Sequence, residues 1–205
     1  MSIDLKEVVY QKNEAQFLSE MANWNVVDKL KGMSVPEILT HQPNSEFAIA
    51  MLNVDGGLNI GSIIRSSVIF GADKVFLIGR RRYDRRSAVG AQNYMNVNYI
   101  DCDPTTDEGS EFALNCLAKY TPVAVELGGQ DIDTYKHRPS MCYIFGSERE
   151  GIPEIFVNKI KDRITIPQLG VMRSLNVSVA AGIVMYEATK GIREFNRFNM
   201  KGSKP

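Results

Sequence analysis

Hydrophobic and polar positions follow one spacing near the start of this chain and another after residue 46. Over residues 13–30, apolar side chains recur at close to helical spacing, which predicts an amphipathic helix that stops at Gly32. The apolar positions of that predicted helix are Phe17, Met21, Trp24, Val27 and Leu30. Residues 33–45 contain Pro36 and Pro43, and we expect a linker there because proline interrupts regular structure.

After residue 46, short apolar runs alternate with segments of helical spacing. The apolar runs predict buried strands over residues 47–54, 74–78, 97–100, 122–127, 141–145 and 163–166. The segments between and after them predict helices over residues 59–70, 104–119, 153–158 and 175–193. Alternation of this kind is typical of an α/β fold in which a mostly parallel sheet has helices on both faces. We therefore expect a helical extension and linker over residues 1–45, followed by one domain over residues 46–205.

Composition places the chain among ordinary globular proteins, since 44% of its 205 residues are hydrophobic and 23% are charged. No apolar run reaches the length of about 18 residues that a membrane span needs, and charged residues stand near the N-terminus where a secretory signal would be apolar. The three cysteines form no CxxC pair, and the two histidines are far apart. We therefore expect a cytoplasmic protein with reduced thiols, no metal site and no membrane partner.

One segment is strongly basic, although the net charge of +0 argues against a strong nonspecific binder of nucleic acid. Five arginines fall within seven consecutive positions, interrupted only by Tyr83 and Asp84. Such a segment is either a solvated loop or a phosphate-binding patch in which Tyr83 could stack on a base. The local concentration of charge favours the second interpretation, in which the RNA-binding residues are Arg80, Arg81, Arg82, Arg85 and Arg86.

Glycines and polar residues gather at three predicted strand ends, where α/β proteins bind their ligands. These segments, whose polar residues core packing does not require, are residues 55–65, 145–153 and 166–183. In the second segment Glu148 stands between two glycines, which predicts a tight turn in which it points inward or caps nearby amides. In the third segment Ser174 is the expected N-cap of the last helix, and Asn176 falls in its first turn. The first segment lacks both a P-loop and the glycine fingerprint of NAD-binding dehydrogenases, which argues against those two classes.

Taken together, the three segments resemble motifs one, two and three of the SpoU/TrmH family. The matching residues are Asn59-x-Gly61-x-x-x-Arg65, Gly146-Ser-Glu148-x-x-Gly151 and Ile166-Pro-x-x-Gly-x-x-x-Ser174-Leu-Asn176-x-Ser-x-Ala-Ala. The resemblance covers residues 46–190 and implies an α/β fold with a C-terminal trefoil knot. It also implies transfer of a methyl group from S-adenosylmethionine to a ribose 2′-hydroxyl of RNA, by a homodimer whose subunits share the active site.

The resemblance further implies roles for individual residues. Arg65 would stand at the 2′-hydroxyl, surrounded by the catalytic and positioning residues Asn59, Glu148, Ser174 and Asn176. Three loops would hold the cofactor through Glu126, Leu127, Gly128, Gly146, Ile166, Leu175 and Asn176. A guanidinium has a pKa above about 12 and accepts no hydrogen bond, so it is a poor base. We therefore expect Arg65 to orient a phosphate and stabilise the developing alkoxide.

Three hypotheses remain about which RNA is the substrate and whether the chain is catalytic. The sequences Glu-Arg-Glu-Gly-Ile-Pro and Met-Arg-Ser-Leu-Asn-Val resemble those of the branch that methylates guanosine 18 of tRNA, which favours tRNA as the substrate. Ribosomal RNA is the alternative substrate. A noncatalytic RNA-binding protein on the same fold is the third hypothesis, and cofactor binding would distinguish it from an enzyme.

Overall fold

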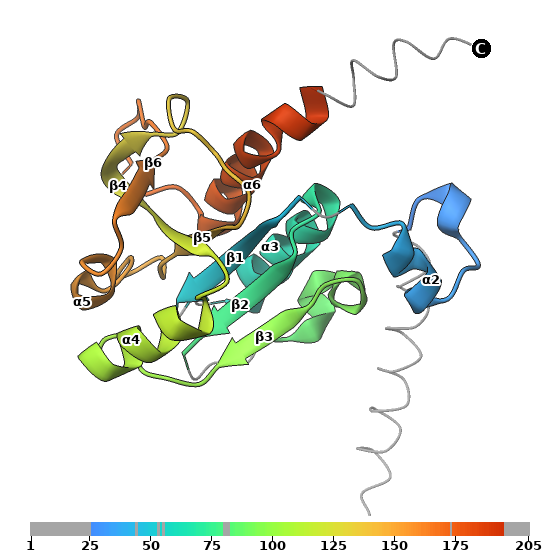
Figure 1. Ribbon diagram of the computed structural model, residues 1–205, viewed down its shortest axis with the longest axis horizontal. Coiled ribbons are helices and arrows are strands. Elements are labelled where there is room, and N and C mark those ends of the chain that lie inside the picture. Colours follow the sequence, from blue (N-terminus) through green and yellow to red (C-terminus); the bar gives the residue numbers. More distant parts are fainter. Residues whose placement is uncertain are drawn as a thin grey trace, which may run out of the picture.

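The computed structural model describes residues 26–43, 45–52, 54, 56–79, 83–172 and 174–194, and its centre is a six-stranded sheet (Figure 1). The strands are β1 (Phe47–Leu52), β2 (Lys74–Ile78), β3 (Val97–Ile100), β4 (Thr121–Asp131), β5 (Met141–Phe145) and β6 (Asp162–Thr165). Their order across the sheet is β3-β2-β1-β5-β4-β6, and every neighbouring pair is parallel. The α/β fold that the alternation of elements predicts is therefore confirmed.

Helices cover both faces of the sheet. The described helices are α2 (Val35–Thr40), α3 (Gly57–Phe70), α4 (Asp107–Cys116), α5 (Glu154–Val157) and α6 (Val177–Ala188), with the 3₁₀ helices η1 (Asp28–Leu30), η2 (Arg85–Ala88) and η3 (Ala91–Asn93). The odd-numbered residues of β1 share one core cluster with α3 and α6, and its even-numbered residues share a second cluster with α4 and α5. Because side chains alternate along a strand, β1 is buried on both faces, which explains its unbroken apolar run.

Strand β4 leaves its regular pairing where the neighbouring strands end. Val125 and Gln130 both pair with Ile164 of β6, so residues 126–129 loop out between them. Gly128 in this loop has φ +81°, a backbone conformation that other residues rarely adopt. The predicted strand over residues 122–127 therefore continues after the loop to Asp131.

The segment before β1 differs from the predicted linker, because residues Val35–Thr40 form helix α2. Pro36 is the second residue of α2, where a missing N–H breaks no helical hydrogen bond. The backbone N–H of Ser34 donates to Glu37 Oε2 at 2.8 Å, which satisfies one end of the helix. The prediction that residues 33–45 lack regular structure was therefore wrong.

Other predicted boundaries shift by a few residues. Helix α3 ends before Gly71, whose φ of +70° confirms the predicted left-handed stop. Helix α4 begins after its N-cap Thr106, whose hydroxyl accepts from the N–H of Gly109 at 3.1 Å, so it is shorter than predicted. Most of the predicted helix over residues 13–30 lies outside the described residues, and its last part forms η1. The trefoil knot and the division of the chain after residue 45 stay predictions.

Candidate active site

The side chain of Asn59 joins three segments that are far apart in the sequence. Its Nδ2 donates to Glu148 Oε1, and its Oδ1 accepts from Asn176 Nδ2 at 3.1 Å. The two partners are 89 and 117 residues away from Asn59 along the chain. Asn59 lies on α3 after β1, Glu148 follows β5, and Asn176 lies between β6 and α6. The parallel strands thus bring all three motif segments to one edge of the sheet.

Asn176 is the N-cap of helix α6. Its Oδ1 accepts from the N–H groups of Ser178 and Val179 at 2.9 and 3.3 Å, which satisfies donors that have no partner within the helix. The prediction that Ser174 is the N-cap was wrong, because the helix begins after Asn176. The same amide oxygen that caps the helix leaves Nδ2 available to donate to Asn59. An asparagine performs both tasks, whereas an aspartate could perform only the first.

A cleft of about 630 Å³ opens beside these residues. It is lined by the loop in β4, the turn after β5, the segment after β6 and the first turns of α6. The predicted site residues that line the cleft are Glu126, Leu127, Gly146, Glu148, Ile166, Ser174 and Leu175. The remaining two predicted cofactor residues, Gly128 and Asn176, are not among the lining residues.

The turn after β5 is as tight as its two glycines predict. A Cβ atom at Gly146 would lie 1.9 Å from the carbonyl carbon of Gly151, so only glycine allows the chain to close here. Ser147 and Gly151 form an isolated antiparallel bridge, with N···O distances of 3.2 and 2.9 Å. Glu148 is exposed on this turn, where its carboxylate accepts from Asn59.

Glu126 is the half-buried carboxylate of the cleft. Burial raises the pKa of Glu126 above its usual value, and the positive charge of Arg163 opposes this rise in part. The other charged residues that line the cleft, Glu148, Arg149 and Glu150, are exposed.

The described arginines of the two remaining predictions are not among the residues that line the cleft. Arg65 is exposed on α3, the helix that also carries Asn59. Arg80, Arg81 and Arg82 lie outside the described residues, while Arg85 and Arg86 are exposed on η2. The guanidinium of Arg86 forms an ion pair with Asp84, with an Nη2–Oδ2 distance of 2.6 Å.

The proposed role of Tyr83 in base stacking was wrong. Tyr83 is 9% exposed, and it belongs to the core cluster of α3 and α6. Burial raises the pKa of Tyr83 to about 12, in agreement with a ring enclosed by the protein. An apolar contact of this kind cannot be distinguished from an exposed stacking position by sequence alone.

Sequence analysis also missed residues that line the cleft. They include Arg149 and Glu150, both in the turn that follows β5. These residues follow Glu148 directly in a short turn, and that closeness in sequence was the available signal. Within the part of the chain that the structure describes, no group of His, Cys, Asp and Glu could hold a metal ion, and no helix is long and apolar enough to cross a membrane.

Comparison with known families agrees with this geometry. The family model described as the SpoU rRNA Methylase family matches residues 46–186, a range that includes all three motif segments. The chain belongs to the SpoU rRNA methylase family. The family is described as one of rRNA methylases, and a relative of this SpoU protein is named as a tRNA/rRNA methyltransferase.

Two relatives illustrate how this SpoU protein compares in length. It is 28% identical over 146 residues to the mouse protein named tRNA (guanosine(18)-2′-O)-methyltransferase TARBP1, covering 67% of this chain and 9% of the mouse protein. It is 27% identical over 184 residues to an Archaeoglobus fulgidus protein named uncharacterized tRNA/rRNA methyltransferase, covering 89% of this chain and 79% of the archaeal protein.

Solved structures show the same fold. The A. aeolicus TrmH/SpoU tRNA modifying enzyme superposes with a TM-score of 0.65 at 18% identity, covering 80% of this chain and 87% of that chain. The AdoMet-bound rRNA methyltransferase from Sinorhizobium meliloti superposes with a TM-score of 0.62 at 24% identity, covering 74% of this chain and 58% of that chain. At these identities the likeness concerns the arrangement of the elements.

Proposed function

We propose that this SpoU protein transfers a methyl group from S-adenosylmethionine to a ribose 2′-hydroxyl of RNA, and that the RNA is tRNA. The observation that carries the proposal is the hydrogen-bonded set of Asn59, Glu148 and Asn176 beside the cleft. These three residues come from three segments that meet at one edge of the sheet, and neither core packing nor helix capping requires the hydrogen bonds that join them. A shared positioning site gives that convergence a purpose.

The cleft fits the cofactor in size and in chemistry. Its volume of about 630 Å³ falls within the range of about 300–1,000 Å³ that is usual for small-molecule sites. Residues of three loops line it, and its described charged residues are mainly carboxylates, which suit a cation. S-adenosylmethionine supplies a methyl group on a positively charged sulfur, which an oxygen can displace in line. Among the structural relatives, the Sinorhizobium meliloti enzyme is named as AdoMet-bound, which supports this choice.

The protein's part in the reaction is mainly to position the ribose and to stabilise charge. A neutral hydroxyl is a weak nucleophile, so its proton must leave as the oxygen attacks. Arg65 is a poor base for that proton, because a free guanidinium is charged and has no acceptor atom. Arg65 instead orients the neighbouring phosphate and stabilises the developing alkoxide, while the proton passes to phosphate, to water or to an arginine transiently perturbed by Ser174. Asn59, Glu148, Ser174 and Asn176 hold the reacting groups in place.

The choice of tRNA rests on similarity and on the arginines of η2. The mouse relative is named as a tRNA methyltransferase. Arg85 and Arg86 lie on η2, which packs so closely on α3 that a Cβ atom at Gly61 would lie 2.3 Å from Ser87 Oγ. The same helix carries Asn59 and Arg65, and contact of Arg85 and Arg86 with RNA phosphates near the target ribose is part of the proposal. Ribosomal RNA is the second candidate, because the family and the Sinorhizobium meliloti enzyme are named for it.

A homodimer is part of the same proposal. Val179 and Tyr186 on α6 are 49% and 48% exposed, and a Cβ atom at Gly182 between them would meet no atom within 4 Å. Val179 and Gly182 lie on the side of α6 away from its buried residues Val177, Ala181 and Val184. The ring of Tyr186 flanks this side and contacts Phe70 of α3 edge to face. A second copy of the chain would cover this apolar face.

One experiment tests the substrate and the reaction together. The protein is incubated with methyl-labelled cofactor and with separated tRNA and ribosomal RNA, and the labelled nucleoside is identified by mass spectrometry. We expect a 2′-O-methylated nucleoside from tRNA. If only ribosomal RNA were labelled, the substrate would be ribosomal RNA and not tRNA. A label on a base would contradict the assignment of the methyl group to the ribose. A protein that binds RNA but no S-adenosylmethionine in calorimetry would instead be a noncatalytic member of the family.

A further inference from the structure

The described lining of the cleft is acidic, although the chain as a whole has a net charge of +0. Among the residues that the structure describes, the charged ones that line it are the carboxylates Glu126, Glu148 and Glu150 and the guanidinium of Arg149. An excess of carboxylates attracts cations and repels the phosphates of RNA. The negative charge of the lining therefore suits a cationic small molecule in the cleft and does not suit the RNA backbone.

Glu126 differs from the other two carboxylates in its surroundings. Glu148 accepts a hydrogen bond from Asn59, and Glu150 is exposed to water. Glu126 is half-buried in the loop of β4, and its Oε1 lies 3.5 Å from the position of a Cβ atom built on Gly151. Among the residues that the structure describes, it makes no hydrogen bond and no ion pair through its carboxylate.

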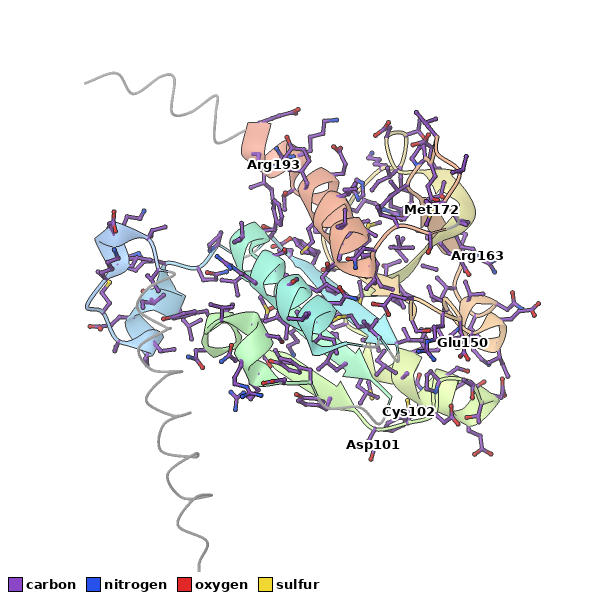
Figure 2. The ribbon with its side chains drawn as sticks, turned by 180° about the vertical axis from the view of Figure 1, so that it is seen from behind. Asp101, Cys102, Glu150, Arg163, Met172 and Arg193 are labelled. Carbon is purple, nitrogen blue, oxygen red and sulfur yellow. The ribbon has the colours of Figure 1, made fainter. Side chains whose placement is uncertain are left out.

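Arg163, whose positive charge acts on the pKa of Glu126, makes no ion pair with its carboxylate. Arg163 attracts it electrostatically, but the guanidinium Nη2 donates to the carbonyl oxygen of Val157 and to Asn158 Oδ1, both at 3.2 Å. These bonds hold the guanidinium at the end of α5, on the side of the molecule where Glu150 also lies (Figure 2). A half-buried carboxylate without a contacting cation is unfavourable in the free protein. A cationic ligand would remove that cost.

We infer that Glu126 recognises the positive charge of the sulfonium cofactor and so distinguishes S-adenosylmethionine from its product. The inference rests on the proposed function. In the reaction the ribose oxygen bonds to the methyl carbon, the carbon–sulfur bond breaks with its electron pair left on sulfur, and the hydroxyl proton is lost to phosphate or water. The sulfur of S-adenosylhomocysteine is therefore neutral. Attraction by Glu126 is present for the substrate cofactor and absent for the product, which favours exchange of the spent cofactor.

Calorimetric binding tests this role without measuring catalysis. The wild type and Glu126→Gln are titrated with S-adenosylmethionine, with neutral S-adenosylhomocysteine and with sinefungin, which has a protonated amine in place of the sulfonium. For a charge at about 5 Å in a partly solvated cleft, we expect Glu126→Gln to weaken both cationic ligands by about five- to fifteen-fold. The affinity for S-adenosylhomocysteine should change by less than about two-fold, and its retention shows that the cleft is still folded.

Two further variants locate the effect. Glu108→Gln removes the same charge from an exposed position on α4, which packs on the face of the sheet opposite α6. This variant should leave all three affinities unchanged. Glu150→Gln removes a carboxylate that water screens, so its effect on the cationic ligands should be smaller than that of Glu126→Gln.

The outcomes separate this inference from the proposed function. Equal weakening of all three ligands by Glu126→Gln would assign Glu126 to a part that all three share, such as the ribose hydroxyls or the α-ammonium group, and would overturn the inference. No change in any affinity, or an equal effect of Glu150→Gln, would also overturn it. Failure of the wild-type protein to bind either S-adenosyl compound would refute the proposed function itself.

Discussion

The side chain of Asn176 donates a hydrogen bond through Nδ2 to Oδ1 of Asn59 at 3.1 Å, while its own Oδ1 caps helix α6. The start of α6 is thereby tied to α3 across 117 residues of chain. The capping bonds fix the amide plane of Asn176, and this fixed plane orients the amide of Asn59. Asn59 in turn presents its Nδ2 to Glu148. Local helix chemistry and the geometry of the site thus depend on the same side chain.

Substitution of Asn176 should separate its two tasks. Asn176→Ala loses the cap and should reduce the free energy of unfolding by about 1 kcal/mol, together with activity. Asn176→Asp keeps an oxygen for the cap but cannot donate to Asn59, so stability should stay while kcat falls by roughly ten-fold or more. Denaturant unfolding and methyl-transfer kinetics measure the two effects. Thr106→Ala removes the cap of α4 and should lower stability alone. Full activity in Asn176→Asp would show that the bond to Asn59 is unimportant.

Asn59→Asp should place two carboxylates in contact. Asp at this position cannot donate to Glu148, and their repulsion should raise the pKa of one of them. We expect kcat to fall by roughly a hundred-fold at neutral pH and to recover partly as the pH is lowered, because a shared proton restores a hydrogen bond. The pH profile of kcat measures this. Asn98→Asp, at an asparagine on β3 that donates to Asn96 Oδ1, is the matched control and should leave the profile unchanged.

Arg65→Lys should abolish most of the activity while leaving cofactor affinity unchanged. Lysine keeps the charge but not the planar fork that orients a phosphate and an alkoxide together. The loss should appear in kcat with the natural RNA, and calorimetry should show the same affinity for S-adenosylmethionine as the wild type. Arg138→Lys, in an ion pair with Asp162 at the start of β6, serves as the control and should retain activity. Near-normal kcat in Arg65→Lys would contradict a role that needs the guanidinium.

Gly182→Trp should dissociate the proposed homodimer. In the single chain this glycine faces open space, so a large side chain there fits the monomer but not a close contact with a second copy of α6. Sedimentation velocity should show a dimer for the wild type and monomers for the variant at the same concentration. Gly191→Trp, also at a glycine with no neighbour within 4 Å, is the control and should remain dimeric. A wild-type monomer would refute the proposal directly.

Glu126 and Glu37 should affect stability with opposite signs. Burial raises the pKa of Glu126, so its contribution to stability is lost as the pH rises through that pKa. Glu126→Gln should therefore have a larger free energy of unfolding than the wild type at neutral pH. Hydrogen bonds from the side chain and backbone of Ser34 lower the pKa of Glu37, so its contribution is present at neutral pH and lost on acidification. Glu37→Gln should therefore be less stable at neutral pH. Both differences should shrink at low pH in denaturant unfolding, and a destabilised Glu126→Gln would contradict the sign.

Predictions from the sequence succeeded where one local pattern has one structural solution. The apolar run of β1 can only be a strand buried on both faces, and Gly71 ends α3 because few other residues adopt its conformation. Predictions failed where two residue types compete for one position. Ser174 and Asn176 are both good N-caps, and Pro36 both breaks a helix interior and suits a first turn. The outcome in each case depended on neighbours that sequence spacing does not reveal.

By itself the sequence determined the alternation of strands and helices, the family, and the three segments in which the site had to lie. These follow from periodicity and from glycine and polar residues at strand ends, which are properties of short stretches of chain. Only the tertiary structure decided that Asn59 contacts both Glu148 and Asn176, that Tyr83 is buried, and that Glu126 faces the cleft from a loop within β4. Such contacts depend on the order and register of strands that meet from distant parts of the chain, and no local pattern contains that information.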